Sequence, residues 1–131
     1  MPYIDAFKKK IDNFNASGLK ISLDLKCHGT ISSTICISMQ GELDNENSPE
    51  LKDLLAHIFD ESELPSKIIL ECSGLTYVSS TGIGAIVFFL MECKKQNVQL
   101  FLAGVPVKVK DIFSLLGFDS YFTFIESPKD I

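Results

Sequence analysis

The sequence has little of what three common classes of protein need: long apolar runs, clustered metal ligands and an excess of basic charge. Its most apolar run, residues 83–91, spans nine residues, whereas a membrane-spanning helix needs about 20. Seventeen acidic against twelve basic residues give a formal net charge of −5, which disfavours binding to nucleic-acid phosphates and to anionic membrane surfaces. The first ten residues also lack the apolar stretch of a secretory signal. We therefore expect a cytoplasmic protein without membrane insertion and without a nucleic-acid partner.

Metal-ligating side chains are few and scattered. The four cysteines at positions 27, 36, 72 and 93 lie at least nine residues apart and form no CxxC pair. Only His28 and His57 could complete a zinc site, and their spacing matches no known ligand pattern. We predict no metal site, and we expect the cysteines to be buried as reduced thiols.

Motifs of catalysis are equally scarce. The acidic pairs 42 with 44 and 61 with 63 fall in polar turns, where carboxylates are ordinarily solvated. No serine lies in a GxSxG motif, and no GxxxxGK[ST] motif occurs. A GxG occurs at residues 82–84, but Val87 stands where a dinucleotide fingerprint needs glycine or alanine. We therefore expect no enzyme, no catalytic residue and no cofactor.

The hydrophobic pattern begins with an amphipathic helix and a β-hairpin. Apolar residues at helical spacing line one face of the first helix: Tyr3, Ile4, Phe7, Ile11 and Phe14. We expect this face to pack on the domain or on a second copy, as a homodimer, and Gly18 to cap the helix end. Residues 20–26 and 31–40 then alternate as strands, joined through a loop at Gly29.

The rest of the chain alternates helices with strands. We predict a turn at 41–49, a helix at 49–59 capped by Ser48, and a central strand at 67–71. A turn over 72–82 leads to a helix at 83–95, a strand at 98–103, a helix at 106–116 and a strand at 121–125. In the helix at 106–116, Val109, Phe113 and Leu116 should point inward. The fold class is α/β, with one mixed, mostly parallel sheet (β-β-α-β-α-β-α-β) covered by helices. Residues 1–18 form a helical extension and residues 19–131 the domain.

Three hydroxyls mark the start of the very apolar helix: Ser79, Ser80 and Thr81. One interpretation is helix capping, worth about 1 kcal/mol, which requires no further function. The other is phosphorylation, because the helix dipole tolerates a phosphate at the N-terminus while a docking partner meets its charge. The adjacent Phe88 and Phe89 point roughly 100° apart on the helix, so one of them is partly exposed or lies at the margin of the core.

Several separated segments resemble the STAS domains, and among these the bacterial anti-sigma factor antagonists. Residues 41–44 read Gly-Glu-Leu-Asp, like the segment after the family's second strand. Residues 75–84 resemble its strand-to-helix turn, which usually ends Asp-Ser-Ser/Thr-Gly-Leu-Gly. Five later residues fit its last helix and the turn beyond it: Pro106, Phe113, Leu116, Gly117 and Phe118. The resemblance covers roughly residues 19–125 and leaves the first helix outside.

The resemblance implies a non-enzymatic switch protein, phosphorylated on serine by an anti-sigma factor with serine kinase activity and restored by a metal-dependent serine phosphatase. Alignment on the two glycines at 82 and 84 puts Ser80 at the phosphorylated position, with Ser79 and Thr81 as the alternatives. Ser79 stands where the family usually has aspartate, which changes the electrostatics beside the acceptor. The implied partner-binding residues are Glu42, Asp44, Ser79, Ser80, Thr81 and Gly82.

Two other functions remain open from the residues. The chain could be a constitutive STAS scaffold or subunit of a stress-signalling or lipid-transport assembly, in which the hydroxyls only cap a helix. An enzyme or small-ligand carrier would need a polar pocket, which the sequence does not reveal.

Overall fold

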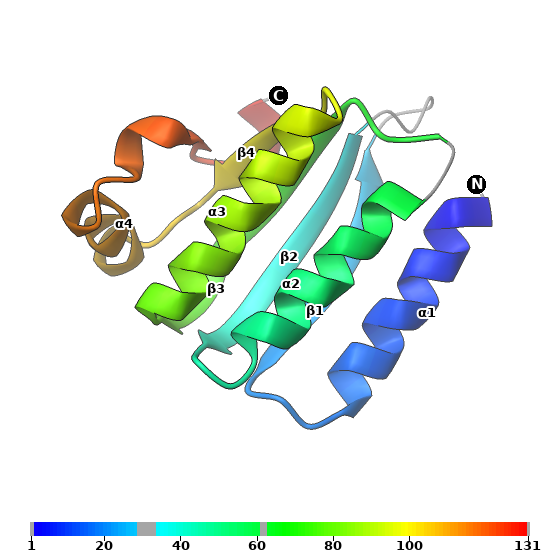
Figure 1. Ribbon diagram of the computed structural model, residues 1–131, viewed down its shortest axis with the longest axis horizontal. Coiled ribbons are helices and arrows are strands. Elements are labelled where there is room, and N and C mark those ends of the chain that lie inside the picture. Colours follow the sequence, from blue (N-terminus) through cyan, green and yellow to red (C-terminus); the bar gives the residue numbers. More distant parts are fainter. Residues whose placement is uncertain (1, 29–33, 61–62, 131) are drawn as a thin grey trace.

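The computed structural model describes residues 2–28, 34–60 and 63–130, and within them five strands form one sheet in the order β1-β2-β3-β4-β5 (Figure 1). The strands are β1 (Ile21–His28), β2 (Thr34–Leu43), β3 (Lys67–Val78), β4 (Gln99–Ala103) and β5 (Thr123–Ile125). β1 pairs with β2 antiparallel, and each later pair of neighbours is parallel. The predicted mixed sheet with a central third strand is thus confirmed. The predicted loop at Gly29 lies outside the described residues.

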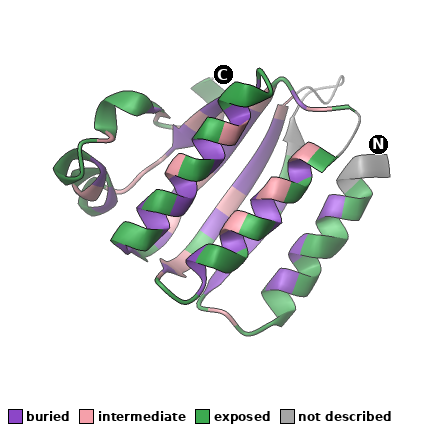
Figure 2. Ribbon diagram, viewed as in Figure 1, coloured by how far each residue is buried: buried purple, intermediate pink, exposed green. Residues whose placement is uncertain are grey.

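Helices cover one face of this sheet. The main helices are α1 (Pro2–Ala16), α2 (Ser48–Ala56), α3 (Ser80–Lys95) and α4 (Val107–Leu115), and 3₁₀ turns follow at η1 (His57–Asp60), η2 (Asp119–Tyr121) and η3 (Pro128–Asp130). α1, α2 and α3 lie side by side against the sheet, and their buried residues face the strands (Figure 2). The core therefore lies between this helical layer and the inner face of the sheet.

The first helix belongs to this layer. Phe7, Ile11 and Phe14 are buried and join the core, while the side chains of Tyr3 and Ile4 lie outside the described residues. After the helix, Gly18 adopts a φ of +81°, as expected of a glycine at a helix end. Of the two predicted arrangements, packing on the chain's own domain is the one observed for the described residues, so burial of Phe7, Ile11 and Phe14 requires no second copy.

The second and third strands extend further than predicted. β2 continues to Leu43 and β3 to Val78, although turns were predicted from residues 41 and 72. Their pairing shifts register between Ser38 and Gln40 and again at Gly41, which has a φ of +111°. A Cβ at Gly41 would clash with the carbonyl oxygen of Lys20. These irregularities let both strands bend without separating, so glycines that suggested turns belong to bulged strands.

Two smaller predictions at helix ends were wrong. Ser48 is the first residue of α2 and not its cap, because Asn47 occupies the N-cap position. Leu116 is 42% exposed, since α4 ends one residue before it, whereas Val109 and Phe113 are buried as predicted. The predicted helix at 49–59 is divided between α2 and η1, and His57 lies on its exposed side.

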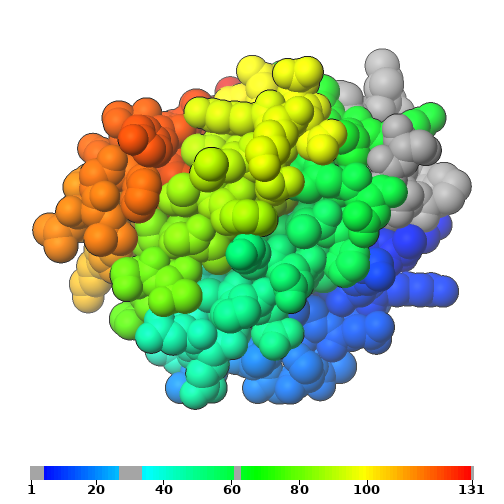
Figure 3. Space-filling view, in the orientation of Figure 1, coloured from blue at the N-terminus to red at the C-terminus, as the bar shows by residue number. Residues whose placement is uncertain are grey.

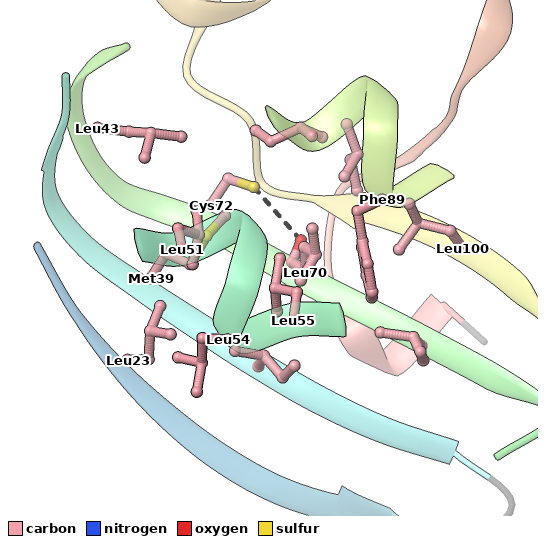
Figure 4. Close-up of a cluster of buried hydrophobic side chains, with 14 of the residues drawn as sticks. Leu23, Met39, Leu43, Leu51, Leu54, Leu55, Leu70, Cys72, Phe89 and Leu100 are labelled. Atoms are coloured by element: carbon pink, nitrogen blue, oxygen red, sulfur yellow. Dashed lines mark hydrogen bonds between the residues drawn. The ribbon is translucent and has the colours of Figure 1, made fainter. Parts of the chain in front are cut away.

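Three cysteines are buried free thiols, as predicted, while the side chain of Cys27 is not described. Figure 4 shows Cys72 within the aliphatic core, where its Sγ donates a hydrogen bond to the carbonyl oxygen of Leu70 at 3.4 Å. Burial raises the pKa of the Cys72 thiol strongly, and it raises the pKa of Cys93 to about 12. Both thiols stay protonated at neutral pH. Among the described residues, no helix has the length and apolar character needed to cross a membrane.

Candidate partner-binding site

The ends of β2 and β3 bring the two segments of interest together. Glu42 lies opposite Tyr77 and Leu43 opposite Val78 in the parallel register. Beyond the last pair, the backbone N–H of Ser79 donates to the carbonyl oxygen of Leu43 at 2.8 Å. The Gly-Glu-Leu-Asp segment (residues 41–44) and residues 79–81, here called the serine turn, therefore form one continuous edge, although Ser79 lies 35 positions after Asp44 in the chain.

The loop after β2 is held by reciprocal side-chain contacts. Oδ1 of Asp44 accepts from the backbone N–H groups of Glu46 at 3.0 Å and Asn47 at 2.9 Å. In return, Oδ1 of Asn47 accepts from the backbone N–H of Asp44 at 2.9 Å, and its Nδ2 donates to the carbonyl oxygen of Glu42 at 2.8 Å. Ser48 Oγ donates to the carbonyl oxygen of Asp44. Asp44, singled out as a partner-binding residue, thus also builds its own turn.

The buried Asn47 is a positioning residue that sequence reasoning missed. Hydrogen bonds of its side-chain amide connect the end of β2 with the start of α2, and they hold the loop that carries Asp44 in place. The spacing of Asp44 and Asn47 was a usable signal, because an aspartate commonly accepts from backbone N–H groups two or three residues later.

The three hydroxyls of the serine turn differ in their surroundings. Ser79 is the N-cap of α3: its side chain is buried and its Oγ accepts from the backbone N–H of Gly82 at 3.0 Å. Ser80 and Thr81, the first two residues of the helix, are exposed. The capping interpretation is therefore confirmed for Ser79 alone, and it leaves the other two hydroxyls at the surface.

Gly82 serves the packing of α3 against the sheet. It is buried, and a Cβ at this position would lie 2.8 Å from Leu43 Cγ and 3.0 Å from Val78 Cγ1. A glycine is therefore needed for the start of α3 to approach the ends of β2 and β3 this closely. Of the six implied partner-binding residues, Gly82 and Ser79 face inward, while Glu42 and Asp44 are half-buried.

Beside the serine turn, α2 and α3 enclose a groove of about 350 Å³. It is lined by Ser48, Pro49 and Lys52 from α2 and by Thr81, Gly84, Ala85 and Phe88 from α3. Nζ of Lys52 lies 4.1 Å from the centroid of the Phe88 ring, a cation–π contact. Figure 3 views the face on which the two helices meet at the surface. Sequence reasoning did not identify Lys52, because its position beside Phe88 depends on the packing of two helices.

The adjacent aromatics on α3 have different environments. Phe88 is 39% exposed at the groove, whereas Phe89 is 2% exposed and its ring lies 5.7 Å from that of Phe59. Of the two alternatives stated for this pair, partial exposure of one ring is the one observed.

The surface around the start of α3 combines hydroxyls, a carboxylate and an apolar groove. Among the described residues, no cluster of three or more His, Cys, Asp or Glu side chains could hold a metal ion. What the surface offers is two exposed hydroxyls at the positive end of a helix dipole, a half-buried carboxylate at Glu42 and an apolar groove. Such a surface can accept a phosphoryl group and dock a protein.

Comparison with known proteins assigns this architecture to a family. Residues 22–131 match the family model described as the STAS domain, and the chain belongs to this family. α1 (Pro2–Ala16) lies wholly before the matched segment and packs on the core of the matched domain.

Individual relatives are distant. The chain is 24% identical over 111 residues to BtrV of Bordetella bronchiseptica, whose name assigns it provisionally to the anti-sigma factor antagonists; the match covers 85% of this chain and 90% of BtrV. The crystal structure of an anti-sigma factor antagonist from Mycobacterium paratuberculosis superposes with a TM-score of 0.69 at 18% identity, covering 84% of this chain and 89% of that one. The murine anion transporter Slc26a9 gives a TM-score of 0.71 at 20% identity, covering 95% of this chain and 23% of the transporter. At these identities, the two structural matches establish the fold alone.

Proposed function

We propose that the chain is an anti-sigma factor antagonist, a non-enzymatic switch that binds an anti-sigma factor with serine kinase activity and is released when Ser80 is phosphorylated. The observation that carries the proposal is the division of roles in the serine turn. Ser79 caps the helix from within, while Ser80 is exposed beside the end of β2. The distant relationship to BtrV supports the same function.

The geometry gives the switch a physical basis. A phosphate adds a charge of about −1.5 to −2, and the N-terminal end of α3 tolerates it. Because Ser80 Oγ is not used by the cap, its modification leaves the fold intact. A partner lying over the turn would meet new charge and bulk, which weakens docking. A metal-dependent serine phosphatase would restore binding, and the cycle would run in the cytoplasm.

The serine at position 79 is compatible with this proposal. Aspartate and serine are both good N-cap residues, so Ser79 keeps the cap that an aspartate would provide. The substitution removes one negative charge next to Ser80, which lowers the repulsion between the acceptor turn and an incoming phosphoryl group.

The test is affinity capture from native cell extract with the Ser80→Ala and Ser80→Glu variants as baits. Ser22→Ala is the matched control, since it removes an exposed hydroxyl from β1, outside the implied partner-binding residues and the groove. Bound proteins are identified by mass spectrometry, after melting curves show that every bait is folded. We expect an ATPase-type serine kinase on the Ser80→Ala and Ser22→Ala baits and its loss from Ser80→Glu.

The second candidate function is a constitutive STAS module within a larger assembly. It is favoured by the similarity of the fold to one part of Slc26a9. Under this alternative, the Ser80→Ala and Ser80→Glu baits retain the same partners and no kinase is among them. That result would overturn the proposed switch.

A further inference from the structure

No contact within the chain explains why α3 has a glycine at position 84. Gly84 lies inside the helix, is exposed, and a Cβ built on it would meet nothing within 4 Å. Glycine in a helix interior costs about 1 kcal/mol relative to alanine. At Gly82 the close contact with Leu43 justifies that cost, but no comparable contact exists at Gly84. The free space above Gly84 is open to something outside the chain.

That space is the groove between α2 and α3. Gly84 and Ala85 contribute almost no side-chain volume to its lining, while Phe88 presents an aromatic surface. Most of the lining surface is apolar. The groove thus matches a protruding apolar side chain better than a polar ligand.

Lys52 places one positive charge beside the groove. Lys52 Nζ lies over the Phe88 ring, and among the described residues no carboxylate forms an ion pair with it. A cation held against an aromatic ring at a surface attracts a carboxylate on a docking protein. The groove therefore complements an apolar side chain that has an acidic neighbour.

The groove is continuous with the switch serine. Thr81 lines the groove and directly follows Ser80. A protein that covers Ser80 therefore meets the groove further along α3, at Gly84 about one helical turn away and at Phe88 about two turns away.

We propose that this groove receives an apolar side chain of the anti-sigma factor, next to a carboxylate that pairs with Lys52. The inference rests on the proposed function and names the part of the surface that selects the partner. Gly84 keeps the groove open, Phe88 provides the apolar contact and Lys52 the charge.

Site-specific photo-crosslinking separates this inference from the proposed function. The photoreactive p-benzoylphenylalanine replaces one of three exposed aromatics: Phe88 in the groove, Tyr77 opposite Glu42, or Tyr121 as the control. The full chain is irradiated in native extract, and crosslinked proteins are identified by mass spectrometry. We expect the anti-sigma factor kinase at positions 88 and 77 and not at 121.

The other outcomes are distinct. A kinase crosslinked from position 77 but not from 88 would overturn the groove and leave the proposed function standing. No kinase at either position would overturn both. Crosslinks from position 88 to a second copy of this chain alone would assign the groove to self-association and overturn the proposal.

Substitutions then test each feature with the kinase recovered from position 77. Gly84→Leu fills the groove and should weaken binding about tenfold or more, whereas Gly84→Ala should have a smaller effect. Lys52→Glu should weaken binding about tenfold and Lys52→Arg should retain it, with Lys94→Glu on the exposed side of α3 as the charge control. Melting temperatures verify the fold, which Gly84→Leu should stabilise because leucine is the better helix former. Wild-type affinity of Gly84→Leu would overturn the proposal.

Discussion

The side-chain amide of Asn15 bonds to both backbone groups of Leu23. Leu23 N–H donates to Asn15 Oδ1 at 2.9 Å, and Asn15 Nδ2 donates to the carbonyl oxygen of Leu23 at 2.8 Å. Leu23 belongs to β1, an edge strand, so these contacts satisfy at one position the backbone groups that an edge leaves unpaired. α1 therefore protects the sheet edge as well as contributing to the core.

Replacing Asn15 with alanine should destabilise the protein by about 1 kcal/mol, because Leu23 loses both partners. Asn13→Ala is the matched control: Asn13 is exposed on the same helix, and both changes give the same gain in helix propensity. Urea unfolding followed by circular dichroism measures the difference. Equal stability of the two variants would contradict the role given to Asn15.

Replacing Gly82 or Gly84 of α3 with alanine should change the stability of the protein in opposite directions. Gly82→Ala forces a methyl group against Leu43 and should cost about 1–3 kcal/mol. Gly84→Ala meets no neighbour and should add up to about 1 kcal/mol through helix propensity. Thermal melts of both variants test the contrast. A loss of stability in Gly84→Ala would show that the chain itself needs that glycine.

Substitutions in the serine turn should distinguish the serine that stabilises the helix from the serine that is phosphorylated. Ser79→Ala removes the cap of α3 and should cost about 1 kcal/mol. Ser80→Ala removes an exposed hydroxyl and should change stability by less than about 0.5 kcal/mol. Incubation with ATP and the captured kinase, followed by phosphopeptide mapping, should give incorporation in the Ser79→Ala variant and none in Ser80→Ala. Phosphate on Thr81 in the Ser80→Ala variant would move the acceptor by one residue.

The two aromatics of α3 offer a similar contrast. Phe89→Ala should destabilise by about 3–5 kcal/mol, because it leaves a cavity beside Phe59. Phe88→Ser should leave the protein folded, since 39% of that side chain is exposed. Partner capture by the Phe88→Ser variant should nevertheless fall. Unfolding of this variant would assign Phe88 to the core instead of the surface.

Because its cysteine thiols are buried, we predict that the protein loses stability at alkaline pH. Burial raises the folded-state pKa of Cys93 from its ordinary 9.0 to about 12. Above pH 9 the unfolded chain loses this proton while the folded chain keeps it, so stability falls as pH rises from 9 towards 12. Urea midpoints under reducing conditions at about pH 7.5 and about pH 10 measure the fall, which Cys93→Ala should reduce. The same fall in both proteins would assign it to other groups.

Much of the fold could be predicted because its signals are local. Alternation over residues 20–26 and helical spacing over 3–14 depend only on neighbouring residues, and both identified their elements. The ends of β2 and β3 could not be predicted in the same way. Gly41 and Gly74 suggest turns locally, but long-range pairing keeps them in bulged strands, where a Cβ at Gly74 would lie 2.7 Å from Gln40 Cγ.

The candidate site shows the same limit. The hydroxyls of the serine turn could be found because they precede an apolar helix, a local pattern. The capping residue Ser79 is held by a hydrogen bond from its backbone N–H to the carbonyl oxygen of Leu43, and the contact between Lys52 and Phe88 depends on the packing of α2 on α3. These relations join elements far apart in the sequence, so no local pattern indicates them.

The interleaving of inward and outward positions in residues 79–84 has an evolutionary consequence. Ser79 and Gly82 are constrained by the fold, whereas Ser80 and Thr81 are exposed and a Cβ at Gly84 would meet nothing within 4 Å. Under the proposed function, duplicated copies of such a gene can change the outward positions, and with them the partner, without losing the fold. Several circuits built on this one scaffold can then operate in the same cell with little cross-binding, because each pair is selected by differences at a few surface positions.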